Sequence, residues 1–286
     1  MKDTILFGDC RETLSQIDEK VRMCVTSPPY YGLRNYGDES NQIGQEDTPE
    51  EYIQNLVDIF RSVRNCLSDD GTLWVNIGDS YYNYRPGKGQ ALVQQSVSKS
   101  KQDLPEKCAR RGNKLEGLKE KDLIGIPWML AFALRADGWY LRQDIIWHKS
   151  NPMPESVRDR CTKSHEYMFL LSKSQNYYFD VDVIKEPTRR KRSVWNVSTK
   201  PYKGSHFAVF PPELITPCIL ASSEENDIIL DPFIGSGTTA MVAKELGRYY
   251  IGCELHEDYG NLIQERMGVS VDKVVHNGLT NALRDV

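Results

Sequence analysis

The feature that most constrains the fold of this chain is a glycine turn held between two short apolar runs. The run Asp227–Leu230 leads into Asp231-Pro-Phe-Ile-Gly-Ser-Gly-Thr-Thr239, which is followed by a helix-period segment at 236–246 and a second apolar run, Tyr249–Cys253. Gly235 and Gly237 permit a tight turn whose backbone can approach a ligand, because neither residue carries a Cβ. The pattern predicts a strand, a turn, a helix and a parallel strand, the repeating unit of a helix-covered sheet.

An acidic residue completes this unit. Glu254 stands 23 residues after Asp231, where a carboxylate can accept hydrogen bonds from both ribose hydroxyls of a ligand bound at the turn. The third glycine of the dinucleotide fingerprint is replaced by Ala240, which favours an adenosine-based ligand without pyrophosphate over NAD. A GxG turn alone is weak evidence, since a purely structural turn explains it equally well, but the complete unit is much stronger.

The rest of the chain repeats the alternation of strand and helix. Further strands are predicted at Asp3–Phe7, Val21–Val25, Thr72–Ile77, Tyr140–Trp147 and Tyr167–Leu171. The clearest helix begins at Thr48, with Pro49 at its first position, a capping box completed by Glu51, and an apolar face from Ile53 to Leu67 before a turn that ends at Gly71. Other helices are predicted from Ile126–Pro127 to before Gly138, after Pro211–Pro212 and near Glu257–Arg266. The expected fold is α/β, with a mostly parallel seven-stranded sheet and helices on both faces.

Length and charge indicate a single domain, residues 1–286, that carries two basic segments. The net charge is −4, yet residues 84–122 hold ten Lys/Arg against five Asp/Glu, and residues 185–203 hold seven against one. We interpret 84–122 as an inserted basic loop and 173–205 as a candidate target-recognition segment, in which Arg189, Arg190, Lys191 and Arg192 contact DNA phosphates. A solvated loop is the alternative for each segment.

Composition excludes several other classes of protein. No apolar run approaches the roughly 20 residues needed to span a bilayer, and the polar start is not a signal peptide, so we expect a cytoplasmic protein with no membrane partner. The seven cysteines are scattered without a CxxC pair, which indicates neither a disulfide framework nor a metal site.

A second motif, Thr26-Ser-Pro-Pro-Tyr30, directly follows the run Val21–Val25. Consecutive prolines stiffen the backbone and donate no hydrogen bonds, so nearby carbonyls stay free as acceptors. The Ser27 hydroxyl, the Pro28 carbonyl and the aromatic face of Tyr30 then form a compact site for a planar amine. A plain turn at the end of a strand is the alternative for this motif taken alone.

The two motifs together resemble the DNA amino-methyltransferases that act on cytosine N4 or adenine N6. The resemblance covers nearly the whole chain, and the base motif precedes the cofactor motif, as in the permuted β-class. It implies a Rossmann-like methyltransferase fold, S-adenosylmethionine as cofactor and double-stranded DNA as substrate. It also implies that a homodimer and a cognate restriction endonuclease are partners to look for. The sequence further predicts that Ser27 and Gly235 open onto one shared cavity.

The resemblance assigns roles to residues across the chain. Ser27, Pro28, Pro29 and Tyr30 form the catalytic turn, with Ser27 and Pro28 accepting the amine protons and Tyr30 stacking on a flipped base. Phe7-Gly8-Asp9-Cys10 resembles the motif whose acid contacts the adenine of the cofactor, and the segment from His206 to Pro211 resembles the one that closes over its methionine end. The expected cofactor-binding residues are Asp9, Thr26, His206, Asp231, Pro232, Phe233, Gly235, Ser236, Gly237, Thr238 and Glu254.

Several readings of the function stay open at this point. SPPY accompanies cytosine N4 more often in this family and DPPY adenine N6, so we predict the former and keep the latter as the alternative. Methylation at cytosine C5 requires a thiolate, and the Pro217-Cys218 pair lies in a predicted helix rather than at a strand end. RNA or a protein amide as substrate, and an inactive DNA-binding regulator that kept the fold, are the remaining alternatives.

Overall fold

A nine-stranded sheet organises the molecule. The computed structural model describes residues 1–32, 42–82, 115–199 and 210–268, together with the backbone of a short strand at 274–275. The strands lie in the order β6-β4-β5-β3-β2-β7-β8-β1-β9. Their bounds are β1 Thr4–Phe7, β2 Val21–Thr26, β3 Leu67–Ile77, β4 Tyr140–His148, β5 His165–Ser172, β6 Val194–Asn196, β7 Ile228–Asp231, β8 Tyr249–Glu254 and β9 Val274–Val275. Only β5 runs antiparallel to its neighbours, β3 and β4.

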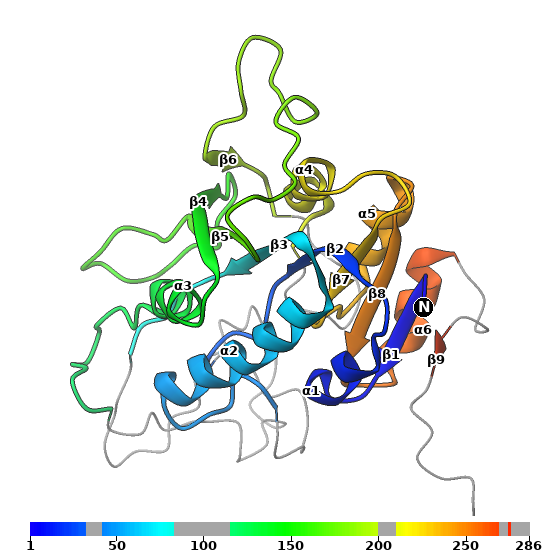
Figure 1. Cartoon of the computed structure of the whole chain (residues 1–286). Helices are drawn as coiled ribbons and strands as arrows, with labels where there is room; N and C mark the ends of the chain where they lie inside the picture. The colour runs from blue at the N-terminus through cyan, green and yellow to red at the C-terminus, as the bar shows by residue number, and fades with distance from the viewer. Residues whose placement is uncertain (33–41, 83–114, 200–209, 269–273, 276–286) are drawn as a thin grey trace, which may run out of the picture.

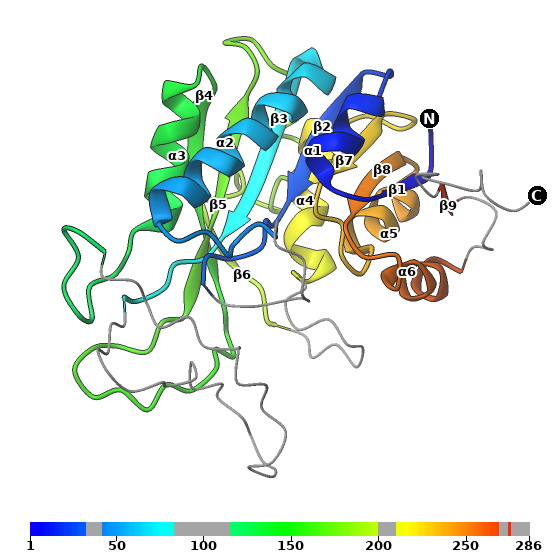
Figure 2. The same cartoon turned by 90° about the horizontal axis from the view of Figure 1, so that it is seen from below.

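Helices cover both faces of this sheet (Figures 1 and 2). On one face, α1 (Cys10–Thr13), the short 3₁₀ helix η1 (Leu14–Gln16), α2 (Pro49–Cys66) and α3 (Ile126–Ala136) share a core with the sheet. On the other, α4 (Pro212–Ser222), α5 (Thr238–Glu245) and α6 (Tyr259–Met267) form a second core. The α/β expectation with helices on both faces is confirmed.

The central strand β2 shows why its sequence is mostly apolar, with Arg22 as the charged exception. Cys24 packs into the core under α2, whereas Met23 and Val25 pack into the core under α4 and α5. All three side chains are fully buried. A strand buried on both faces does not alternate apolar and polar residues, so the mostly apolar run Val21–Val25 is the pattern expected of the middle of a covered sheet. Arg22 is the exception, and its guanidinium pairs with Asp70 and Asp227.

The capping box predicted at the start of α2 is present. The Thr48 hydroxyl accepts from the Glu51 amide at 3.2 Å, and the Glu51 carboxylate accepts from the Thr48 amide at 3.3 Å. The predicted end of this helix is wrong, because Leu67 already has extended dihedrals and pairs with Val21 as the first residue of β3. The register shifts between the Val21 and Met23 pairs, so residues 68–71 form an irregularity inside a longer strand rather than a separate turn.

Two edge strands explain why the sheet has nine strands rather than the seven expected. β6 pairs with the outer side of β4 and β9 with the outer side of β1. They contain three and two residues. Such short segments carry no periodicity that a sequence pattern could reveal. Within the described residues, no helix is both long and apolar enough to cross a bilayer.

Candidate active site

Four neighbouring parallel strands end at the same edge of the sheet, and each carries a predicted site motif there. In the order β2-β7-β8-β1, the chain leaves β2 into Ser27, β7 at Asp231, β8 at Glu254 and β1 shortly before Asp9. In open α/β sheets, ligands bind in the crevice beyond the carboxyl ends of the strands. The topology therefore gathers motifs from both ends of the sequence at one edge.

A buried carboxylate joins the two principal motifs directly. The Thr26 hydroxyl donates to Asp231 Oδ1 at 2.5 Å, although the two residues are 205 positions apart in the sequence. The Thr239 hydroxyl donates to Oδ2 at 2.6 Å, and the Phe233 amide donates to Oδ1 at 3.0 Å. Burial raises the pKa of Asp231 to about 6 against the opposing effect of these three donors. Asp231 thus holds the start of the TSPPY turn against the glycine turn.

The glycine turn is fastened to Glu254 through backbone donors. The Gly235 amide donates to Glu254 Oε2 and the His256 amide donates to Oε1, both at 3.0 Å. Gly237 has φ +81°, and a Cβ there would lie 3.1 Å from the Ile263 side chain, so strain and crowding both favour glycine. Burial raises the pKa of Glu254 to about 7, and the two amide donors lower it.

The hydrogen-bonding groups that stay unused at this turn fit a ligand that carries a ribose. Each Glu254 oxygen accepts one amide hydrogen bond, and a carboxylate oxygen has a second lone pair for a ligand hydroxyl. Among the described residues, the buried Thr238 hydroxyl has no hydrogen-bond partner. A buried hydroxyl without a partner costs free energy, which a bound ligand group would recover.

The TSPPY turn is anchored from behind by α2. The Tyr52 hydroxyl donates to the Pro29 carbonyl at 2.8 Å, and the Tyr52 ring lies 5.5 Å from that of Tyr31. No donor among the described residues occupies the Pro28 carbonyl, and the Ser27 side chain is only half-buried. The Ser27 hydroxyl forms a hydrogen bond with the Tyr30 hydroxyl and the Pro29 carbonyl accepts from Tyr52, so both fix the turn, and the Pro28 carbonyl is left as an acceptor.

Tyr30 reaches into a polar network on β3 and β5. Its hydroxyl donates to Glu166 Oε2 at 2.6 Å and lies 3.4 Å from Asn76 Oδ1. Burial, followed by the nearby Glu166 carboxylate, raises the pKa of Tyr30 well above its usual value. The hydroxyl is therefore protonated at neutral pH and acts as a donor.

A cavity of about 380 Å³ lies beside Tyr30. Its lining includes Gly78, Lys149, Lys163 and Glu166 as well as the Tyr30 ring. The Lys163 ammonium donates to the Asp79 carbonyl at 2.9 Å, and the Asp79 carboxylate accepts from the amide that opens α3, that of Ile126, at 3.1 Å. Polar groups from several segments of the chain therefore line this cavity.

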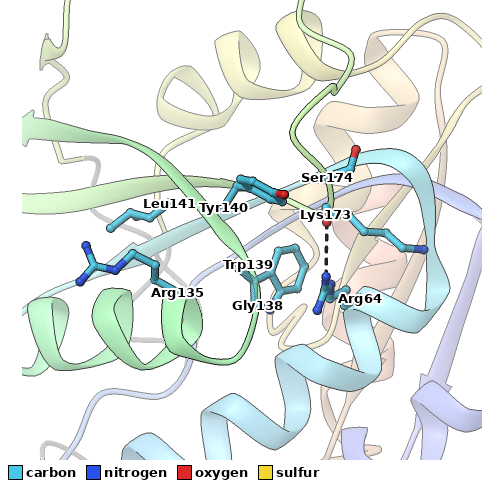
Figure 3. Close-up of a pocket in the computed structure, with 8 residues that line it drawn as sticks. All are labelled: Arg64, Arg135, Gly138, Trp139, Tyr140, Leu141, Lys173 and Ser174. Carbon is cyan, nitrogen blue, oxygen red and sulfur yellow. Dashed lines mark hydrogen bonds between the residues drawn. The ribbon is translucent and has the colours of Figure 1, made fainter.

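A larger hollow, of about 600 Å³, lies at the opposite edge of the sheet, near the start of β4 and the end of β5. Three cationic residues line it, but Figure 3 shows the Arg135 side chain pointing away from Arg64. The Arg64 guanidinium donates instead to the Lys173 carbonyl at 3.4 Å, and the Lys173 ammonium donates to the Leu67 carbonyl at 2.7 Å. The cations do not converge, so this hollow is not a candidate for the active site.

The structure brings most of the predicted site residues to the edge described above. Those gathered there are Thr26, Ser27, Pro28, Pro29, Tyr30, Asp231, Pro232, Phe233, Gly235, Ser236, Gly237, Thr238 and Glu254. Asp9 follows β1 at the same edge, but its carboxylate pairs with the Arg11 guanidinium and caps α1 through the Arg11 amide. His206 lies outside the described residues, as do residues 84–114 of the basic insertion. Their roles stay predictions.

Two of the four residues in the basic cluster Arg189–Arg192 contact other side chains of the protein. Arg189 pairs with Glu186 at 2.5 Å, and the Lys191 ammonium lies 5.0 Å from the centre of the Trp195 ring. Arg190 and Arg192 are exposed. Trp195 itself is buried against Trp74.

The resemblance places the segments Asp144–His148 and Ser164–Leu171 beside the base pocket, but sequence reasoning did not single out the polar residues of the cavity wall, namely Asn76, Lys149, Lys163 and Glu166. The available signal was a charged residue, Glu166, directly before the predicted strand Tyr167–Leu171; the observed strand β5 begins earlier, at His165, and includes it. Asn76 is similarly a single buried amide in an apolar strand. Their common purpose depends on neighbouring strands, so it becomes visible only when the sheet is assembled.

Comparison with known proteins gives this arrangement a family. A family model described as DNA methylase (N6_N4_Mtase) matches residues 21–265. The type II methyltransferase M.SmaI of Serratia marcescens is 52% identical over 271 residues, covering 92% of this chain and 90% of the relative. M.Cfr9I of Citrobacter freundii is 48% identical over 270 residues, covering 92% and 87%.

Solved structures show the same fold at much lower identity. The PvuII DNA methyltransferase, described as cytosine-N4-specific, matches with a TM-score of 0.69 at 18% identity, covering 97% of this chain and 88% of that one. The M1.HpyAVI–SAM complex matches with a TM-score of 0.58 at 20% identity, covering 93% and 98%. The family model spans most of the chain, and close relatives match over nearly their full lengths. The chain belongs to the DNA methylase family of N6 and N4 amino-methyltransferases.

Proposed function

We propose that this protein transfers a methyl group from S-adenosylmethionine to the exocyclic N4 amine of cytosine in duplex DNA. The observation that carries the proposal is the Thr26–Asp231 hydrogen bond, because it joins the amine-accepting turn to the cofactor turn. The M1.HpyAVI–SAM complex, a solved structure with the same fold, supports S-adenosylmethionine as the cofactor. The remaining lone pairs of the Glu254 carboxylate and the Thr238 hydroxyl would bind its polar groups. S-adenosylmethionine supplies an electrophilic methyl group on a sulfonium.

The residues of the chain would prepare the amine for attack. The lone pair of an exocyclic amine is delocalised into the ring, so the amine is a poor nucleophile. Hydrogen bonds from its two N–H groups to Ser27 Oγ and the Pro28 carbonyl favour a pyramidal nitrogen, and they strengthen as positive charge develops. S-adenosylmethionine bound at the glycine turn would supply the methyl group, and the TSPPY turn would hold the amine nitrogen in line with it. Positioning supplies several kcal/mol of the barrier reduction.

The amine cannot be reached inside a duplex, so the target base must flip out, at a cost of about a few kcal/mol. The cavity beside Tyr30 is the space we assign to the flipped base. Stacking on the Tyr30 ring recovers about 1–3 kcal/mol by comparison with other base–aromatic contacts. The Tyr30 hydroxyl is held by Glu166, and Tyr30 lines the cavity, so we assign its ring to the contact with the base.

Cytosine rather than adenine is favoured by the SPPY form of the motif and by the cytosine-N4-specific description of the PvuII structure. Adenine N6 is the alternative, since the same acceptors hold the same kind of amine. Methylation at C5 is disfavoured, because Cys218 is fully buried in α4 and burial raises the pKa of its thiol well above the usual value. A buried neutral thiol cannot serve as the nucleophile.

Residues 173–205 are proposed as the target-recognition segment, with Arg189, Arg190, Lys191 and Arg192 contacting phosphates. The basic insertion 84–122 is proposed as a second DNA-facing segment within a single domain. A homodimer and a cognate endonuclease remain predicted partners, and an inactive regulator is the competing function. The presence of Ser27, Tyr30, Asp231 and Glu254 together argues for an active enzyme.

One experiment tests the proposal as a whole. Purified protein is incubated with random-sequence duplex DNA and labelled S-adenosylmethionine, and modified bases are identified by mass spectrometry and mapped by sequencing. N4-methylcytosine at a defined site is the expected product. N6-methyladenine would select the alternative, 5-methylcytosine would overturn the assignment, and cofactor binding without turnover on any DNA would favour the regulator. RNA and protein substrates run in parallel serve as the control for substrate class.

A further inference from the structure

Glu166 occupies the meeting point of three strands and the catalytic turn. It lies on β5, where it faces Trp147 of β4 in the antiparallel register. Its carboxylate accepts from the Tyr30 hydroxyl at 2.6 Å and from the Asn76 amide at 3.2 Å, both at Oε2. The Lys149 ammonium forms an ion pair with the other oxygen, Oε1. Each of these partners comes from a different segment of the chain.

The hydrogen-bond network around Glu166 is mostly buried, which restricts the positions that its side chains can take. The side chains of Glu166 and Lys149 are 14% and 21% exposed. Asn76 is itself fixed, because the same amide nitrogen donates to the Tyr167 carbonyl at 3.1 Å. Shielded, charge-assisted hydrogen bonds are stronger and more directional than those on an open surface. The carboxylate is consequently held in place and can hold the Tyr30 hydroxyl in turn.

A second contact fixes the Tyr30 ring from its side. A Cβ placed on Gly78 would lie 2.9 Å from Tyr30 Cε2 and 3.4 Å from the Glu166 carboxyl carbon. Gly78 has no left-handed dihedral that would call for glycine, so its missing side chain serves the close approach of the ring. The Tyr30 hydroxyl is thus held by a hydrogen bond to Glu166, and the edge of its ring packs against Gly78.

We propose that Glu166 is a positioning residue that fixes the Tyr30 ring, so that the surface receiving the flipped base is formed before DNA binds. The inference rests on the proposed function, since it assumes that Tyr30 stacks on the target base. Preorganisation lowers the cost of ordering the site when the substrate arrives. Glu166 would act on turnover through Tyr30, without touching the cofactor.

The test compares Glu166→Ala, Tyr30→Phe and the double variant at the methylated site established for the unaltered protein. Glu166→Ala is expected to lower kcat by about 10- to 100-fold, the usual value of a hydrogen bond to a charged group. The affinity for S-adenosylmethionine should stay unchanged, and the fluorescence of 2-aminopurine placed beside the target base should report less complete flipping. The double variant should lose no more than about the larger single loss, because both changes remove one interaction.

Two further variants separate the hydrogen bond to Tyr30 from the packing of its ring. Glu166→Gln keeps an acceptor oxygen for Tyr30 and should lose less than Glu166→Ala. Gly78→Ala leaves the carboxylate in place but displaces the ring, and should reproduce the flipping defect. The matched control is Asp227→Asn, since Asp227 is a half-buried carboxylate that pairs with Arg22 at 3.0 Å at the far end of the sheet. It should lower the melting temperature but not kcat.

Different outcomes separate this inference from the proposed function. Absence of methyl transfer by the unaltered protein would refute the proposed function. An active protein whose Glu166→Ala variant keeps its kcat, or whose losses at Glu166 and Tyr30 simply multiply, would overturn the positioning role. Equal losses for Glu166→Ala and Glu166→Gln would also overturn it, because charge rather than the hydrogen bond to Tyr30 would then matter.

Discussion

The carboxylate of Glu254 should make cofactor binding depend on pH. Burial raises its pKa to about 7, so it is partly protonated at neutral pH in the free protein. The ionised form accepts hydrogen bonds from the ribose hydroxyls more strongly, and it also attracts the positive sulfonium. Binding should therefore weaken as the pH falls through 7, where the carboxylate gains its proton.

The size of this effect follows from the titration. With a pKa of about 7, roughly one tenth of Glu254 is ionised at pH 6 and roughly nine tenths at pH 8. If only the ionised form binds tightly, the affinity for S-adenosylmethionine should fall about tenfold between pH 8 and pH 6, which is about 1.4 kcal/mol. Isothermal titration calorimetry at several pH values measures this slope directly.

The variant Glu254→Gln isolates the carboxylate. It should bind the cofactor about 10- to 100-fold more weakly at pH 8, as expected for loss of hydrogen bonds to a charged group, and should show no slope between pH 7 and 8. Asp231, whose pKa is raised to about 6, remains in this variant and would contribute only at the acid end. A flat profile in the unaltered protein, or the same slope in the variant, would refute the reasoning.

The same carboxylate should also influence folding. A folded-state pKa above the unfolded value of 4.5 means that the native protein binds more protons between those values, so stability falls as the pH rises from about 4.5 to 7. The cost at higher pH is about 3 kcal/mol if the unfolded carboxylate titrates normally. Bound cofactor should offset this cost by favouring the native state.

Three further perturbations probe other parts of the molecule. Thr26→Val removes the donor to the buried Asp231 and should lower the free energy of unfolding by about 1–3 kcal/mol, measured by urea denaturation. Ser27→Ala should reduce kcat about 100-fold while cofactor affinity is retained, and unchanged turnover would contradict its role as acceptor. Replacing both Arg190 and Arg192 with Ala should lower the slope of log affinity against log salt by about two; an unaltered slope would identify an idle surface.

The sequence predicted those parts of the fold that depend on local patterns. The run Val21–Val25 is mostly apolar because β2 is covered on both faces, and the capping residues Thr48 and Glu51 act within one turn of α2. The glycine turn is likewise local, since the positive φ of Gly237 requires glycine wherever the turn occurs. Such features are visible without knowing the neighbouring strands.

Other features depend on contacts that a linear pattern does not contain. Leu67 continues the apolar spacing of α2, yet its pairing with Val21 makes it the start of a strand. Asp9 was expected to face a ligand, but nothing in the sequence showed that Arg11 would take its carboxylate. Glu166 directly precedes the predicted strand Tyr167–Leu171, and only the assembled sheet places Tyr30, Asn76 and Lys149 around it.

The position of β2 between β3 and β7 has a consequence for how the protein is made. Its partner on one side, β7, begins at residue 228, so the strand emerges from the ribosome about two hundred residues before its neighbour exists. Pairing across so long a separation is slow, because the entropy of closing the loop opposes it before any contact is gained. We expect the centre of this sheet to mature last during synthesis, and nascent chains to depend on protection of this exposed apolar strand until then.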